Sequence, residues 1–111
     1  MNILTVGDQQ VALDKDGFLV DLQAWSHEVA EALAAREAIA LTADHWEVLE
    51  VLRAFYQQYQ LSPATRPLIK YTALKLGADK GNSPHLNRLF NGTPAKLAAK
   101  LAGLPKPTNC I

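Results

Sequence analysis

Proline and glycine divide the second half of this chain into short segments. Three helix starts are marked by a hydroxyl residue directly before proline: Ser62-Pro63, Ser83-Pro84 and Thr93-Pro94. Three glycines follow apolar runs, where glycine commonly ends a helix: Gly77, Gly92 and Gly103. Proline fits the first helical turn and glycine the residue after the last. The spacing predicts three short helices, over 62–76, 85–90 and 95–102.

The first half carries two different periodicities. Alternating apolar and polar residues around turn signals predict short hairpin strands at 3–6, 11–13 and 18–20. After Asp21 the apolar spacing becomes helical and predicts one helix carrying Trp25, Val29 and Leu33. Thr42 is the expected N-cap of a second, stronger helix that continues to Tyr59.

A chain of 111 residues, 49% hydrophobic and 20% charged, can bury one core but not two. We predict a mainly α fold: a small single domain of about five short helices with an N-terminal β-hairpin. Its body would span residues 1–102. Residues 103–111 contain two prolines and no periodic apolar face, which predicts an extended, flexible C-terminal arm.

Charge and segment composition exclude several classes of function. Eleven basic and eleven acidic residues cancel, so no net charge attracts the chain to nucleic acid or an anionic membrane. No apolar run suits a signal peptide or a membrane span. The expected location is the cytoplasm, where a lone cysteine stays reduced. The segment 62–76 also resembles a helix-turn-helix, although it lacks a clear basic recognition face.

Cys110, the single cysteine, is the candidate reactive group. Its place in the arm favours exposure over packing, although an incidental thiol remains an alternative. A terminal arm cannot hold a catalytic base rigidly beside a thiol, so independent catalytic turnover is not expected. These features favour a carrier whose partners supply the activation.

Other side chains have simpler interpretations. Trp25 and Trp46 are expected in the core, and His45 as a surface or capping residue. The three histidines lack metal-ligand spacing, so neither a metal nor a cofactor is predicted. Several bases form either a basic rim beside the arm or an ordinary solvated surface: Arg53, Arg66, Lys70, Lys80 and Arg88.

The arm ending, 102–111, resembles the terminal arm of the DsrC/TusE family, in which Leu-Pro-Lys-Pro precedes a penultimate cysteine. Further blocks similar to that family lie along nearly the whole chain: 16–19, 41–48, 55–56, 62–66, 80–83, 88–90 and 92–96. The resemblance implies a helical domain, built partly on a helix-turn-helix unit, and a persulfide-carrying thiol at Cys110. It also makes Arg66 and Lys80 candidate docking or anion-stabilising residues. Lys106, a base within the arm, is a third candidate for this role.

Family members with two cysteines carry the second one eleven positions earlier, and the matching residue here is Ala99. A single-cysteine arm is similar to the TusE branch. That branch implies a sulfur relay from a TusBCD-like donor complex to an MnmA-like tRNA thiouridylase, with tRNA reached only through the partner. Two alternatives stay open: a single-cysteine DsrC-like protein that partners dissimilatory sulfite reductase, and a regulatory interaction protein.

Overall fold

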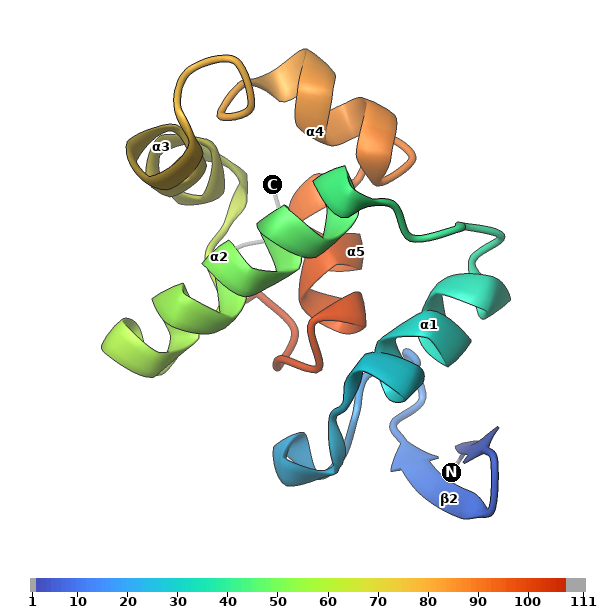
Figure 1. Ribbon diagram of the computed structural model, residues 1–111. Helices are drawn as coiled ribbons and strands as arrows, with labels where there is room; N and C mark the ends of the chain where they lie inside the picture. Colours follow the sequence, from blue (N-terminus) through green and yellow to red (C-terminus); the bar gives the residue numbers. More distant parts are fainter. Residues whose placement is uncertain (1, 108–111) are drawn as a thin grey trace.

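The computed structural model describes residues 2–107, which form a small, mainly helical domain with an N-terminal hairpin (Figure 1). The order of elements is β1 (Asn2–Val6), β2 (Gln9–Leu13), the 3₁₀-helix η1 (Leu22–Ala24), α1 (His27–Arg36), α2 (Ala43–Tyr59), α3 (Thr65–Leu76), α4 (Ser83–Leu89) and α5 (Pro94–Leu101). The predicted fold class, five short helices behind a hairpin, is confirmed.

The hairpin pairs β1 with β2 antiparallel, with Leu4 opposite Val11. Both of these side chains are buried, so this face of the hairpin packs on the core. The predicted third strand at 18–20 was wrong, because only an isolated bridge joins Leu13 to Leu19. The Asp14 carboxylate accepts hydrogen bonds from the Asp16 and Phe18 amides, which form a tight turn after β2. Val20, which follows Leu19, is 55% exposed.

The predicted helix after Asp21 is two elements. Asp21 caps η1, and Ser26 accepts a hydrogen bond from the Val29 amide to cap α1. Trp25 therefore lies in extended backbone between the two elements, and its expected place on the helix was wrong. The Ser26 cap explains this difference, because an N-cap residue leaves the helical conformation and orients the residue before it separately.

The start of α2 confirms Thr42 as N-cap. His45 completes a capping box, in which its Nδ1 contacts the Thr42 amide at 3.1 Å. Its Nε2 lies 2.9 Å from the Leu89 carbonyl oxygen at the end of α4. His45 is only 7% exposed, so its capping role is confirmed and its surface placement was wrong.

The proline starts were predicted to within a few residues. α3 begins at Thr65, because its N-cap residue, Ala64, has extended backbone. α4 begins at Ser83 and is capped by Asn82, whose side chain accepts from the His85 amide. α5 begins at Pro94, one residue before the predicted start.

α5 occupies the centre of the domain, with the other helices around it (Figure 1). It contacts α1, α2, α3 and α4, and six of its eight residues are buried. The sequence favoured α2 as the central packing element because of its broad apolar stripe. Short α5 takes that position because alanines at 95, 98 and 99 let neighbouring helices approach closely. Among residues 2–107, no helix is long and apolar enough to cross a membrane.

Candidate functional site at the base of the C-terminal arm

Cys110, the predicted reactive residue, lies outside the described residues. The structure does describe the base of its arm, which we define as residues 103–107. The sequence left open whether the arm rests against the body. Leu104 and Pro107 are both buried, so the arm base packs on the domain without forming a sixth helix.

Gly103 turns the chain away from α5 into the arm. Its φ of 73° lies in the left-handed region, and a Cβ placed there would lie 2.3 Å from Cδ1 of Trp25. The Trp25 indole Nε1 in turn donates to the Leu101 carbonyl at 2.9 Å. Glycine is therefore required at this corner both for its backbone and for the close approach of the indole.

Arg53 of α2 reinforces the same corner. Its Nη1 donates to the Ala102 carbonyl at 2.6 Å, and its guanidinium lies 4.0 Å from the Trp25 ring centroid. Burial lowers the pKa of Arg53 below its ordinary value, although guanidinium remains charged near neutral pH. Arg53 was predicted only as one of several rim bases. Its specific role depends on Trp25, which is distant in sequence.

Two hydrogen bonds hold the next arm residues. The Leu104 amide donates to the Ala99 carbonyl at 2.9 Å. The hydroxyl of Ser62, which is 4% exposed, donates to the Pro105 carbonyl at 2.5 Å. Sequence reasoning missed this role of Ser62, because the Ser-Pro pair signals a helix start and not a long-range partner.

An ion pair holds the arm at Lys106. Its Nζ lies 3.2 Å from Asp16 Oδ2 in the turn after the hairpin. The hydrogen bond from Lys106 lowers the pKa of the Asp16 carboxyl below its usual range. Asp16 had no predicted role, although the segment 16–19 contributed to the family resemblance.

Lys80, another of the predicted basic residues, forms its ion pair within the body of the domain. Lys80 pairs with Glu47 at 2.6 Å, and this contact raises the pKa of the lysine above its ordinary value. The neighbouring Gly81 lies so close to α3 that a Cβ would meet the Ala73 amide nitrogen at 2.2 Å. Lys80 thus fastens the α3–α4 loop to α2, while Arg66 is exposed on α3.

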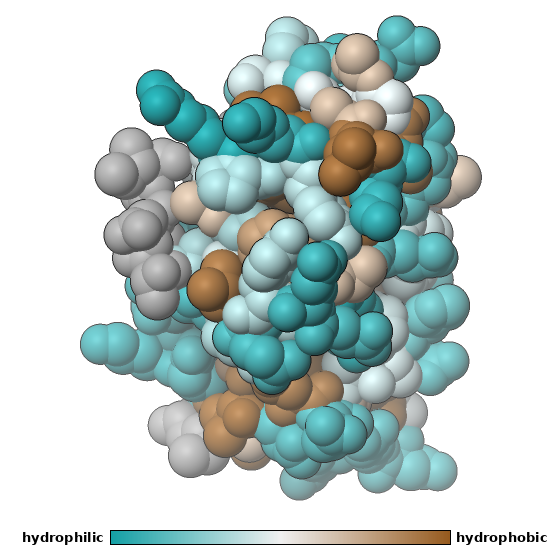
Figure 2. Space-filling view, turned by 90° about the vertical axis from the view of Figure 1, so that its left-hand side faces the viewer, coloured by the Kyte–Doolittle hydropathy of each residue, from teal (hydrophilic) through white to brown (hydrophobic). Residues whose placement is uncertain are grey.

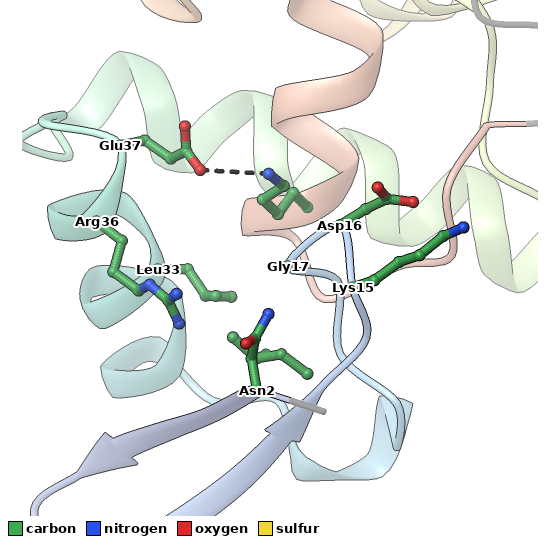
Figure 3. Close-up of a pocket in the computed structure, with 9 residues that line it drawn as sticks. Asn2, Lys15, Asp16, Gly17, Leu33, Arg36 and Glu37 are labelled. Atoms are coloured by element: carbon green, nitrogen blue, oxygen red, sulfur yellow. Dashed lines mark hydrogen bonds and ion pairs between the residues drawn. The ribbon is translucent and has the colours of Figure 1, made fainter.

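A polar cavity of about 160 Å³ lies between the hairpin, α1 and α5 (Figure 3). Asp16 lines it and connects it to the arm through Lys106. Lys100 and Glu37 pair across it at 3.2 Å. Among the described residues, no group of three or more His, Cys, Asp or Glu side chains could hold a metal ion.

The docked base limits how far the thiol can reach. Cys110 is the third residue after Pro107. Three extended residues span at most about 11 Å, compared with about 30 Å for the whole arm. A partner must therefore approach the arm base closely, or the base must undock to present the thiol.

Comparisons with known proteins agree on one family. A family model described as DsrC like protein matches residues 5–111. A Haemophilus influenzae protein named Sulfurtransferase TusE homolog is 52% identical over 109 residues, covering 98% of this chain and 100% of that protein. The Pectobacterium atrosepticum protein named Sulfurtransferase TusE is 52% identical over 101 residues, covering 91% of this chain and 93% of its own.

Solved structures share the fold over the whole domain. The solution structure of Allochromatium vinosum DsrC has a TM-score of 0.90 and 43% identity, covering 99% of this chain and 98% of that one. The oxidized γ-subunit of the dissimilatory sulfite reductase, DsrC, from Archaeoglobus fulgidus has a TM-score of 0.86 and 39% identity. The match covers 99% of this chain and 100% of that one.

Proposed function

The chain belongs to the DsrC-like protein family, and on that premise we propose that it is a sulfur carrier that accepts persulfide sulfur on Cys110. It passes this sulfur to a partner enzyme. Relatives about half identical over nearly the whole chain are named Sulfurtransferase TusE, and this similarity supports a relay function.

One observation carries the assignment to Cys110: it is the only thiol in the chain, and it is the third residue after the docked arm base. Ala99 occupies the position at which the family resemblance places the second cysteine of two-cysteine members. It is fully buried, and its carbonyl accepts the Leu104 amide. With alanine there, the molecule contains no second thiol that could attack a persulfide on Cys110.

The proposed chemistry is two sulfane transfers. The Cys110 thiolate attacks the outer sulfur of a donor persulfide, the donor S–S bond breaks, and the donor cysteine leaves as a thiolate. A thiolate of the acceptor then attacks the outer sulfur on Cys110, which leaves as a thiolate in turn. Each step conserves electrons, so the carrier needs neither an oxidant nor a reductant.

The pathway that best fits the TusE-named relatives is 2-thiolation of the tRNA wobble uridine in the cytoplasm. In this pathway a TusBCD-like complex would load Cys110, and an MnmA-like thiouridylase would receive the sulfur. The carrier itself needs no direct contact with tRNA, because the thiouridylase holds the nucleic acid.

A genetic experiment tests the pathway. In a host lacking the chromosomal copy, wild type should restore 2-thiouridine in tRNA, measured by mass spectrometry of nucleosides, and Cys110→Ser should not. Thr108→Ser is a matched control that changes the same arm and leaves the thiol. Full restoration by Cys110→Ser would contradict the proposal.

The second candidate is a DsrC-like role in dissimilatory sulfur metabolism. The structural similarity to DsrC proteins favours it. Copurification with a sulfite reductase, together with normal tRNA thiolation in the deletion strain, would select this candidate. The single thiol excludes an intramolecular disulfide cycle in either pathway.

A further inference from the structure

The neutral net charge of the chain conceals a strong asymmetry between its halves. Residues 1–50 contain ten of the eleven carboxylates and only two of the eleven bases. Residues 51–111 contain the other nine bases and a single carboxylate, Asp79. Such an asymmetry creates opposed local fields that the total charge does not show.

Ion pairs between the halves neutralise part of this asymmetry. Lys80 pairs with Glu47, Lys100 with Glu37 and Lys106 with Asp16. Each pair joins a base of the second half to a carboxylate of the first. These contacts place the three lysines against acidic residues of the first half. The electrostatic potential at the surface of the second half therefore depends on its remaining bases.

Six bases of the second half form no ion pair within residues 2–107, and three of them lie on α3; the other three are Arg53, Arg88 and Lys96. Arg66, Lys70 and Lys75 lie exposed along this helix, which contains no acidic residue. Within residues 2–107, none of the three forms an ion pair. From Val51 to Ala78 the sequence contains no carboxylate at all, so α3 carries an uncompensated positive charge.

Exposed apolar side chains lie among these bases. Leu74 is 78% exposed, and Tyr59 and Leu61 are each 49% exposed. Together with Arg66, Lys70 and Lys75 they define what we call the α2–α3 face. On the side of the molecule that carries α3 and the end of α2, Figure 2 shows apolar side chains emerging between hydrophilic ones.

The α2–α3 face is continuous with the base of the arm. Leu61 directly precedes Ser62, whose hydroxyl holds the Pro105 carbonyl. A partner seated on this face would therefore lie beside the arm where the arm leaves the body. The reach of about 11 Å from Pro107 to the thiol makes such a close approach necessary while the arm base stays docked.

We propose that the α2–α3 face docks an acidic protein surface with an apolar centre, belonging to a protein that exchanges sulfur with Cys110. The proposal rests on the proposed carrier function and adds the surface used and the chemistry of the partner. The bases of the α2–α3 face would attract the acidic partner at long range, and Leu74 would form an apolar contact at the centre of the interface.

A protein fits this face better than RNA does. RNA binding through aromatic residues requires exposed ring faces on which bases stack. Here Tyr71 packs edge-to-face on Phe55 at 5.1 Å, and Lys75 lies over the Tyr71 ring at 5.4 Å. These two rings are thus engaged between α2 and α3, and Tyr59, although 49% exposed, packs on Phe55 with ring centroids 4.6 Å apart. The most exposed apolar group, Leu74, is aliphatic and offers a base no stacking surface.

The test measures binding of the full chain to two purified proteins from the same host, the TusBCD-like complex and the MnmA-like enzyme. Lys70→Glu should weaken binding to at least one of them by about tenfold at low salt, because reversal replaces attraction by repulsion. Lys15→Glu, an equal charge reversal in the exposed turn after the hairpin, should have little effect. Leu74→Ser should weaken binding, while Val20→Ser, also exposed, should not.

Two further measurements separate the possible outcomes. Loading of Cys110 by a small persulfide, glutathione persulfide, should be equal in wild type and Lys70→Glu, because it needs no docking. Absence of loading even in wild type would reject the carrier function itself. Unchanged affinity of Lys70→Glu and Leu74→Ser for both proteins would overturn the docking surface. Binding of unmodified tRNA is measured in parallel, and a loss of affinity for tRNA alone would also overturn it.

Discussion

Replacing Gly103 by alanine tests how the arm base is held. The backbone there has a φ of 73°, where an L-residue such as alanine is disfavoured by about 1–2 kcal/mol. The new Cβ would also lie 2.3, 2.6 and 2.8 Å from three Trp25 atoms. Carbon atoms normally pack at about 3.5–4.0 Å, so the indole or the arm must move by about 1 Å.

That movement disturbs two further contacts. The indole would lose its hydrogen bond to the Leu101 carbonyl, and Arg53 would lose its position over the ring. Overpacking of this kind costs about 1–3 kcal/mol in addition to the backbone strain. We therefore expect Gly103→Ala to lower the free energy of unfolding by about 2–5 kcal/mol.

Urea unfolding followed by circular dichroism measures this loss, with Gly92→Ala as the matched control. Gly92 also follows a helix and has a φ of 83°, but nothing lies within 4 Å of its added Cβ. The control should show only the strain of about 1–2 kcal/mol. In a Trp25→Ala background, the excess cost of Gly103→Ala should largely disappear. Equal losses for the two glycine variants would refute the reasoning about Trp25.

Three further substitutions have defined outcomes. Ser62→Ala leaves the Pro105 carbonyl without its donor and should cost about 1–3 kcal/mol, with faster hydrogen exchange at the Leu104 amide; unchanged exchange would argue against the anchor. Lys106→Met should raise the NMR-measured pKa of Asp16, because the ion pair lowers that pKa. The stability that the pair gives the folded protein is lost as pH falls through the lowered pKa. An unchanged Asp16 titration in the variant would contradict this. His45→Ala should cost about 2 kcal/mol in thermal or urea unfolding, and His45→Gln less, since glutamine can retain the capping box.

The local signals of the sequence predicted most of the fold. Thr42 and Pro94 mark helix starts through contacts within one turn, so their positions could be read directly. The same reasoning failed where a neighbouring residue takes the N-cap position or interrupts the predicted helix. Ser26 caps α1 and excludes Trp25 from the helix, and Asn82 caps α4 in place of the hydroxyl residue after it.

The candidate site was predictable only in part. Composition and proline spacing led to Cys110 and to a boundary at Gly103, and both stay predictions. The contacts that dock the arm join residues far apart in sequence, such as Ser62 to Pro105 and Asp16 to Lys106. No periodicity encodes such pairs, because they depend on how the hairpin and the α2–α3 connection pack around α5. The charge asymmetry was present in the sequence, but the net charge of zero concealed it.

The central claim is that Cys110 carries sulfur, and intact mass spectrometry tests it most directly. Reduced protein is mixed with a cysteine desulfurase, cysteine and the upstream relay proteins, and any adduct is located by peptide mapping. The account predicts a mass gain of one sulfur atom on Cys110 that a thiol reductant reverses and that Cys110→Ser abolishes. No gain with any competent donor, or a gain that persists in Cys110→Ser, would contradict it.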